Sequence, residues 1–350
     1  MKGTDRAKLV RVKVSGYKSF GSNHDALDID LRDINVIIGS NGSGKSNFLS
    51  FFSLLSHMMT NALQTYVAKQ GFANQMLHYG SKNTRSIEAE LHFKNGRYKN
   101  IYKFCLDYAA NDKLVIGQET FQLNDRTEQL SSGEWESYFA KVQSSYKNKQ
   151  IIHMMLSRCR AFQFHDTSRT AYIRSSAKLT DSRYLFSDGG NLPAVLYRLQ
   201  QENPQYFARI ENFVRRMVPG FRAFALAPDV FSPGAIFLNW CGVDSSEYLL
   251  GPSQMSDGSL RFIALATLLL QPPAMLPNVV LIDEPELGLH PQAIDVLAFM
   301  LKEASRHAQV IIATQSERLL DAFPPEDIVV AEYDTHRRSS SFKRLQVVRI

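Results

Sequence analysis

The feature that most constrains this chain is the octet G-S-N-G-S-G-K-S at residues 39–46, which directly follows an apolar run at residues 34–38. The octet fits the pattern G-x-x-x-x-G-K-[ST], in which glycines let successive backbone N–H groups turn inward around a polyphosphate. In this pattern Lys45 places a positive charge at the β- and γ-phosphates, and the Ser46 hydroxyl is a ligand for Mg²⁺. The sequence therefore predicts a buried strand, a phosphate-binding loop and a helix, in that order.

The start of the helix after this loop adds the positive end of its dipole to the site. A glycine-rich turn that binds nothing is the alternative, and the buried strand before the loop disfavours it. We therefore expect the whole loop and the next helical residue to contact a nucleotide. These residues are Gly39, Ser40, Asn41, Gly42, Ser43, Gly44, Lys45, Ser46 and Asn47.

Composition narrows the class of protein. The chain has 350 residues, of which 44% are hydrophobic, enough for a sizeable core in one large or two ordinary domains. A net charge of +6 is compatible with an acidic partner such as nucleic acid but does not establish one. Cys105, Cys159 and Cys241 are far apart and form no C-x-x-C pair, so neither a disulfide framework nor a zinc site is indicated.

Targeting signals are not evident. The first residues lack the apolar core of a signal peptide, and the longest apolar run, residues 262–270, is far too short to span a bilayer. Together with the cysteine usage, this leads us to expect a cytoplasmic protein with no membrane partner.

The N-terminal half is typical of antiparallel β-structure on either side of the loop and its helix. Residues 9–14 and 26–31 alternate between apolar and polar, as half-buried strands do. Three more alternating runs, residues 86–93, 98–108 and 114–123, are separated by turn-forming residues and indicate an antiparallel meander.

The C-terminal half has a different pattern. Residues 132–218 are mostly helical in pattern, and Pro204 interrupts the best helical stretch. From residue 258 an apolar helix is followed by a continuous apolar strand at 279–282, a helix at 291–306 and another apolar strand at 310–313. Apolar strands that alternate with helices predict an α/β fold whose parallel strands are covered on both faces.

The strand at 279–282 ends in two acids, Asp283 and Glu284. A carboxylate at this edge of the sheet can hold the Mg²⁺ shell, and the next one can orient a water for in-line attack on the γ-phosphate. A strand that merely ends in a charged turn is the alternative. Because the pair follows a phosphate-binding loop, we expect Asp283 to be a metal ligand and Glu284 to be catalytic.

A third motif opens the apolar helix. Ser256 is a good N-cap, and Gly258 leaves room for an anion to approach the free N–H groups of the first turn. Taken alone, this pattern describes an ordinary capped helix. In its context, residues 255–259, M-S-D-G-S, resemble the signature L-S-G-G-Q of ATP-binding-cassette ATPases, with Asp257 and Ser259 as departures. We expect Ser256, Asp257, Gly258 and Ser259 to contact nucleotide.

Two further segments complete the resemblance. Residues 286–291 lie where that superfamily has its D-loop, and Gln315 lies where it has its switch residue, usually a histidine in transport-type cassettes. The amide of Gln315 can donate to a γ-phosphate but cannot take a proton. A polar residue that caps a strand is the alternative for Gln315, and for His290 we expect a helix-starting role.

These motifs, in this order over almost the whole chain, resemble the AAA-family ATPases of the RecF, SMC and OLD branch of the ABC superfamily, in particular the stand-alone bacterial members. The resemblance implies ATP and Mg²⁺ as ligands and an ATP-dependent homodimer. Two copies would pack head to tail, with each nucleotide between Lys45 of one copy and Ser256 and Gly258 of the other. Catalysis would fall to Lys45, Glu284 and Gln315. Candidates for the family's Q-loop are Gln163, His165 and Asp166.

The resemblance also sets the expected organisation. It implies one ABC-type ATPase domain over residues 1–350, with its core in 1–80 and 245–335, a β meander at 81–130 and a helical insert with the signature-side lobe at 131–245. No stretch carries sustained heptads, so we expect no coiled-coil arm. Only some 35 residues follow Gln315, whereas OLD-type proteins carry a nuclease domain after the ATPase.

Two functions remain open. The first is an ATP-gated dimer that switches a separate effector, such as a nuclease or toxin in a phage-defence system; the second is a RecF-like repair ATPase that clamps DNA. A nucleotide-binding subunit of a transporter is disfavoured by Gln315 and by the atypical signature. A DNA surface would use cations interleaved with aromatic rings, although the same segment can be a solvated basic face. The cations are Arg158, Arg160, His165, Arg169, Arg174, Lys178 and Arg183, and the rings are Phe162, Phe164, Tyr172 and Tyr184.

Overall fold

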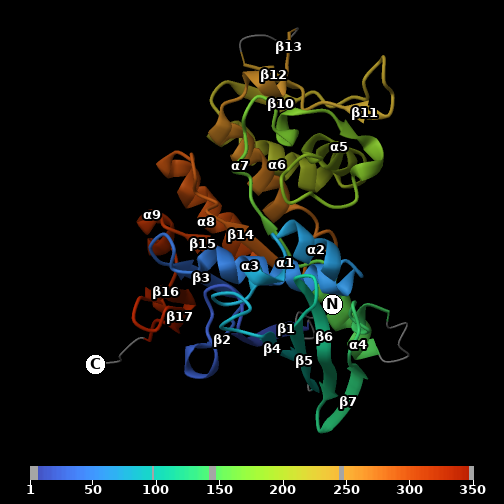
Figure 1. The fold of residues 1–350 in the computed structure, drawn as a ribbon. Helices are drawn as coiled ribbons and strands as arrows, with labels where there is room; N and C mark the ends of the chain where they lie inside the picture. Colours follow the sequence, from blue (N-terminus) through green and yellow to red (C-terminus); the bar gives the residue numbers. More distant parts are fainter. Residues whose placement is uncertain (1–6, 97, 142–146, 244–247, 347–350) are drawn as a thin grey trace. The chain divides into compact units, whose positions relative to one another are not determined.

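The computed structural model describes residues 7–346 apart from 97, 142–146 and 244–247. The chain divides into two compact units, the first made of Met1–Arg160 with Pro324–Ile350 and the second of Ala161–Phe323. Figure 1 labels the elements of both units, which are described one at a time below.

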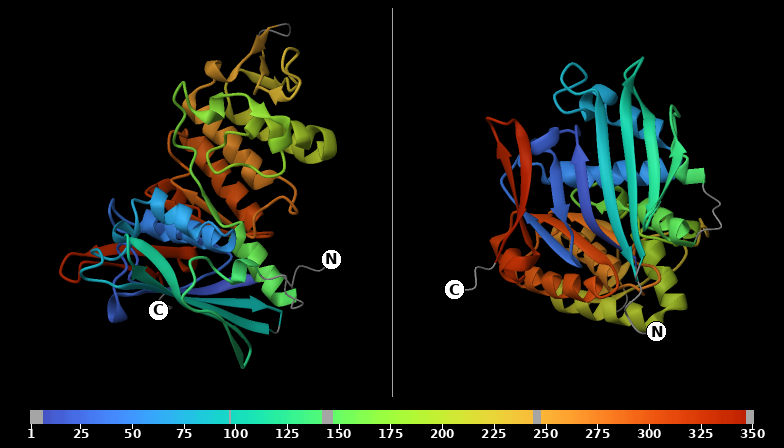
Figure 2. Two further views of the ribbon diagram at one scale, coloured as in Figure 1. Left: turned by 45° about the vertical axis from the view of Figure 1, so that its right-hand side comes forward. Right: turned by 90° about the horizontal axis from the view of Figure 1, so that it is seen from below.

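A six-stranded antiparallel sheet dominates the first unit, with the strand order β2-β1-β4-β5-β6-β7. Its long strands run side by side in the right-hand view of Figure 2. Inward residues alternate with outward ones, as in β4, because one face packs on the core of the unit. The strands are β1 (Lys8–Ser15), β2 (Leu27–Asp30), β4 (Ser86–Asn95), β5 (Tyr98–Ala109), β6 (Lys113–Leu123) and β7 (Arg126–Ser131).

A second group of strands in this unit carries the phosphate-loop motif. Strand β3 (Ile34–Ile38) pairs in parallel with β16 (Ile328–Asp334), and β16 pairs antiparallel with β17 (Ser339–Arg344). The strand predicted from residues 34–38 is therefore β3. The final two strands are distant in sequence but complete the surroundings of the loop that follows β3.

Helix α1 (Lys45–Met59) follows the loop and lies at the centre of the first unit. Phe51 stacks on Phe104 of the antiparallel sheet, with ring centroids 6.4 Å apart, whereas Phe48 lies 5.4 Å from Phe342 of β17. The helix thus joins both strand groups through buried aromatic rings. The other helices of this unit are α2 (Leu63–Lys69), α3 (Ala73–Met76) and α4 (Lys147–Ser157).

The second unit contains the predicted α/β segment. Strands β14 (Val279–Asp283) and β15 (Gln309–Thr314) pair in parallel and are buried along their whole length. Helix α7 (Asp257–Leu270) packs against both α6 (Pro204–Met217) and α8 (Pro291–Ser305). These helices and strands place three motifs in one unit: the signature at the start of α7, the acid pair after β14 and Gln315 after β15.

Residues 131–245 are less helical than expected. Helix α5 (Leu192–Glu202) ends just before Pro204, which begins α6, as the proline predicts. Several short strands also occur here among the described residues. The sequence did not predict them, because elements of two to four residues are too brief to show a hydrophobic period. The short strands of the second unit are β9 (Ala177–Lys178), β10 (Phe221–Phe224), β11 (Ala235–Ile236), β12 (Trp240–Gly242) and β13 (Leu249–Leu250); β8 (Arg160–Phe162) marks the passage between the units and α9 (Glu317–Asp321) follows β15.

Candidate functional site

The loop at residues 39–46 joins β3 to α1 in the first unit, as predicted. Gly44 forms the N-cap of α1 with φ of 100°, a left-handed conformation that glycine adopts without strain. A Cβ atom on Gly44 would also overlap the side chain of Ser340 in β17. The sequence places glycine here because both the backbone angle and the neighbouring strand exclude a side chain.

Lys45 is 6% exposed, and its side chain folds back over the loop. The Nζ atom donates hydrogen bonds to the carbonyl oxygens of Gly39, at 2.6 Å, and Ser40, at 3.0 Å. Ser43 Oγ is buried in the same loop without a hydrogen-bond partner among the described residues. An ammonium group and an unsatisfied hydroxyl within a turn of backbone N–H groups fit a polyphosphate. Asn47 differs from the others because its side chain donates to Ser19 Oγ, at 2.9 Å.

In the second unit, Asp283 is the last residue of β14 and is 6% exposed. Gln163 donates from Nε2 to the Asp283 carboxylate, with a distance of 3.0 Å to Oδ2. His165 Nε2 lies 3.0 Å from the carbonyl oxygen of Asp283. Of the three Q-loop candidates, Gln163 and His165 therefore adjoin the expected metal ligand, whereas Asp166 is exposed and accepts from the N–H of Ser168.

Glu284 follows Asp283 in a left-handed backbone conformation, with φ of 44°. This conformation is unfavourable for a residue with a side chain, and such strain is concentrated at functional sites. Gln315 donates from Nε2 to Glu284 Oε1, at 2.7 Å. Two of the three residues expected to be catalytic, Glu284 and Gln315, are therefore in direct contact.

Glu286, the first residue of the expected D-loop segment, is a neighbour of this pair. Its Oε1 accepts from Thr314 Oγ1, at 2.6 Å, and from the backbone N–H of Gln315, at 3.1 Å. The carboxylate thereby connects the turn after β14 to the end of β15 and fixes the position of the Gln315 backbone. Its closeness to Asp283 and Glu284 in sequence was the only available signal for this role.

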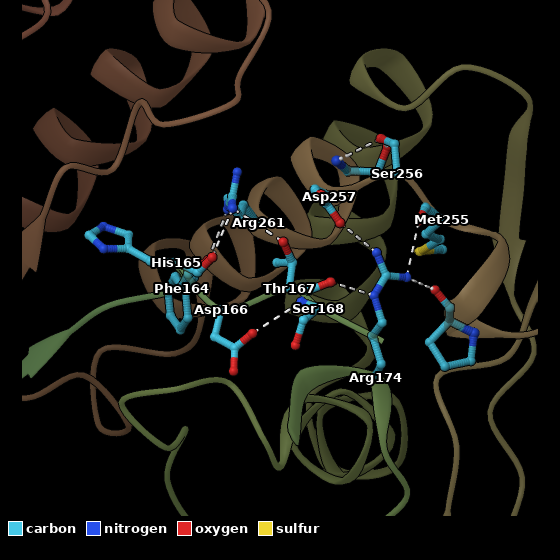
Figure 3. Close-up of polar contacts among 12 residues, drawn as sticks. Phe164, His165, Asp166, Thr167, Ser168, Arg174, Met255, Ser256, Asp257 and Arg261 are labelled. Carbon is cyan, nitrogen blue, oxygen red and sulfur yellow. Dashed lines mark hydrogen bonds and ion pairs between the residues drawn. The ribbon is translucent and has the colours of Figure 1, made fainter. Parts of the chain in front are cut away.

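The signature segment begins helix α7. Ser256 is the N-cap, as predicted, because its Oγ accepts from the N–H of Ser259, at 3.1 Å; the two hydroxyl oxygens are 2.8 Å apart (Figure 3). Gly258 packs directly on the turn after β14, where a Cβ atom would overlap the carbonyl oxygen of Gly288. His290 is the N-cap of α8, which agrees with its expected helix-starting role.

Asp257, the departure from the usual glycine, is explained by Arg174. The guanidinium donates from Nη2 to Asp257 Oδ1, at 2.7 Å, and this hydrogen bond lowers the pKa of the carboxyl group below its ordinary value. The same guanidinium donates to the carbonyl oxygens of Thr167, Pro252 and Met255 (Figure 3). Its side chain is only 10% exposed, so Arg174 fixes the signature loop and is not part of an open basic face. No sequence signal indicated this pairing across 83 positions.

A pocket of about 600 Å³ lies beside the signature segment in the second unit. Ser256, Gly258 and Ser259 form part of its wall, and Gly288 and His290 form another part. Three arginines from the end of α6 and the start of β10 also line it, together with apolar residues such as Val218, Phe221 and Phe262; the arginines are Arg215, Arg216 and Arg222. The backbone N–H groups at the start of α7 and the neighbouring hydroxyl groups are the part of this pocket suited to an anion.

The fold defines a class, that of the ATPase head domains. The structure resembles the SMC head bound to the C-winged helix domain of ScpA, with a TM-score of 0.62 and 16% identity over 97% of this chain and 98% of that one. An Smc head domain from Pyrococcus furiosus with an extended coiled coil, bound to the C-terminal domain of ScpA, has a TM-score of 0.60 and 13% identity over 97% of both chains. The SMC head domain from Thermotoga maritima has a TM-score of 0.53 and 16% identity over 97% of this chain and 100% of that one.

The sequence places the chain more specifically. Residues 34–148 and 161–321 match the family described as "AAA domain, putative AbiEii toxin, Type IV TA system", and the chain belongs to that family. No curated protein matches the sequence. The predicted α/β fold of an ATPase head and the predicted kinship with the SMC-like branch are thus confirmed. Over the part of the chain that the structure describes, no helix is both long and apolar enough to cross a bilayer.

Proposed function

We propose that this protein binds and hydrolyses ATP, dimerises head to tail around it, and thereby switches a separate effector. The single observation that carries the proposal is the pocket beside the signature, where Ser256 and Gly258 present a helix start next to arginine side chains. Such a pocket suits the γ-phosphate of a nucleotide that a second copy holds in its own loop.

The residues divide the chemistry between them. In the first unit, the loop with Lys45 binds the phosphates and Ser46 is a candidate Mg²⁺ ligand. In the second unit, Asp283 is the other candidate ligand and Glu284 orients the attacking water, held in place by the 2.7 Å contact from Gln315. Bound Mg²⁺ would neutralise phosphate charge. Gln315 acts by donating hydrogen bonds, since an amide cannot serve as an acid or base.

The role of effector switch rests on the family and its structural relatives. The family description names a putative toxin and a toxin–antitoxin system, and two of the similar head domains are bound to parts of ScpA. A nuclease or toxin from a defence system is the partner we propose. A DNA clamp is less well supported, because Arg174 and His165, two of the proposed DNA contacts, are already engaged inside the second unit.

A mixing experiment tests whether the site is shared between copies. Lys45→Ala removes the positive charge that binds the phosphates, and Ser256→Phe fills the signature face. Each variant alone should hydrolyse no ATP. In an equal mixture, half of the dimers contain one intact site, so about a quarter of the wild-type activity should return. The activity is measured as phosphate release at a fixed total protein concentration.

Two controls make the result decisive. Ser256→Phe should still bind ATP as tightly as the wild type, since its own phosphate-binding loop is intact. A mixture of Lys45→Ala with Lys45→Met should stay inactive. Activity in Ser256→Phe alone, or none in the Lys45→Ala and Ser256→Phe mixture, would contradict a head-to-tail composite site.

A further inference from the structure

Arg261, five residues after the N-cap of α7, has an unusual set of partners. Its Nε donates to the carbonyl oxygen of Phe164, at 3.0 Å, and its Nη2 donates to the carbonyl oxygen of His165, at 2.8 Å, and to Thr167 Oγ1, at 3.2 Å (Figure 3). Its Nη1 donates to the carbonyl oxygen of Leu287, at 3.3 Å. The guanidinium of Arg261 therefore donates to neutral oxygens of two segments that are distant in sequence.

The first of these segments, residues 163–167, reaches the expected metal ligand. Gln163 and His165 contact Asp283 from one end of the segment, and Arg261 holds its backbone from the other side. A change at Asp283 that moves Gln163 or His165 therefore acts on carbonyl oxygens that Arg261 holds. The route from the carboxylate to helix α7 consists of hydrogen bonds no longer than 3.0 Å, from Gln163 and His165 to Asp283 and from Arg261 to Phe164 and His165.

The second segment is the turn after β14. Arg261 holds its Leu287 carbonyl, and the adjacent Gly288 carbonyl packs on Gly258 of the signature. The N-cap of helix α7, Ser256, also lies on the wall of the pocket beside the signature, the signature pocket. One guanidinium therefore connects the Asp283 side of the unit with both parts of the signature pocket.

We infer that Arg261 is a positioning residue that couples Asp283 to the signature face, so that occupation of one half-site adjusts Ser256 and Gly258 for the other. This inference rests on the proposed function, in which Asp283 and Ser256 of one chain serve two different nucleotides. A planar guanidinium suits the role because its N–H groups point in fixed directions, whereas a lysine offers a single mobile point charge.

Hydrogen–deuterium exchange of the full chain tests the coupling directly, with Mg²⁺ and a non-hydrolysable ATP analogue as the probe. In the wild type, the probe should slow exchange at residues 163–167 and at residues 256–261. Arg261→Ala should keep the first response and lose the second, which also shows that the variant is folded. Arg198→Ala, which removes an exposed ion pair with Glu202 on α5, is the matched control and should keep both.

Steady-state hydrolysis provides the second measurement. Arg261→Ala should lower kcat ~10-fold or more while KM changes less than about twofold, because misplaced groups slow the step without weakening the first binding event. Arg261→Lys should behave like Arg261→Ala, since it keeps the charge and loses the fork.

Three results would overturn the inference: an unchanged exchange response at residues 256–261 in Arg261→Ala, no response there in the wild type, or full rescue by Arg261→Lys. Failure of the proposed function is distinguishable. It would appear as no hydrolysis by the wild type and no complementation in the mixture, while the exchange experiment still reports on Arg261.

Discussion

Asp257 is the residue at which the chain departs most clearly from the signature that it resembles. A carboxylate in the first turn of a helix is favourable for the helix but repels a phosphate bound at the same end. Arg174 partly neutralises this charge and holds the carboxyl group ionised by lowering its pKa. In the proposed dimer, the charge that remains would weaken ATP binding at the signature pocket without abolishing it.

We predict that Asp257→Asn increases the apparent affinity of ATP-dependent dimerisation ~3-fold or more, since the repelling charge is lost. Asp257→Gly, which restores the usual signature residue, should act in the same direction. Arg174→Ala should act in the opposite direction, because Asp257 then keeps its charge without a partner. Analytical ultracentrifugation against ATP concentration measures all three. A weaker dimer for Asp257→Asn would show that the carboxylate supports the contact.

At the scale of single elements, the antiparallel sheet is anchored by Glu119 in β6. This side chain is fully buried and accepts hydrogen bonds from Tyr102 Oη, at 2.7 Å, Ser131 Oγ, at 2.7 Å, and the N–H of Tyr138, at 2.9 Å. Ser137 Oγ donates to it as well. A carboxylate can accept from all four donors, and it fastens the segment after β7 to the sheet.

We predict that Glu119→Gln lowers the free energy of unfolding by about 2–3 kcal/mol, because the new amide N–H₂ faces donors and leaves them unpaired. Urea unfolding followed by the fluorescence of the nearby Trp135 measures the change. The control is Glu134→Gln, an exposed change in the same segment, with an expected effect within about 0.5 kcal/mol. Equal stabilities for the two variants would mean that the four contacts do not support the sheet.

Elements long enough to show a hydrophobic pattern were predictable from the sequence, whereas contacts between segments distant in sequence were not. β3, the loop and α1 were predicted because an apolar run, glycines and a lysine lie together in the chain. Arg174 and Arg261 act largely through backbone carbonyl oxygens, which carry no residue-specific signal. The left-handed conformation of Glu284 was equally invisible, since nothing in a glutamate side chain favours it.

At the scale of the whole molecule, the central claim is that ATP joins two copies until hydrolysis separates them. In this proposal, nucleotide-dependent association would provide a timer, and a separate effector would sense which state is present. The relation to SMC head domains concerns the fold, so the claim stands on the signature pocket and on the contact between Glu284 and Gln315.

The most direct test is static light scattering of Glu284→Gln with ATP and Mg²⁺. Glutamine keeps the oxygen that accepts from Gln315 but cannot orient the water as a carboxylate does, so binding should persist while hydrolysis stops. We predict a mass near twice the 39.7 kDa of one chain with ATP, and the monomer mass without nucleotide or with Lys45→Ala added to the same chain. A monomer mass for Glu284→Gln at saturating ATP would contradict the account.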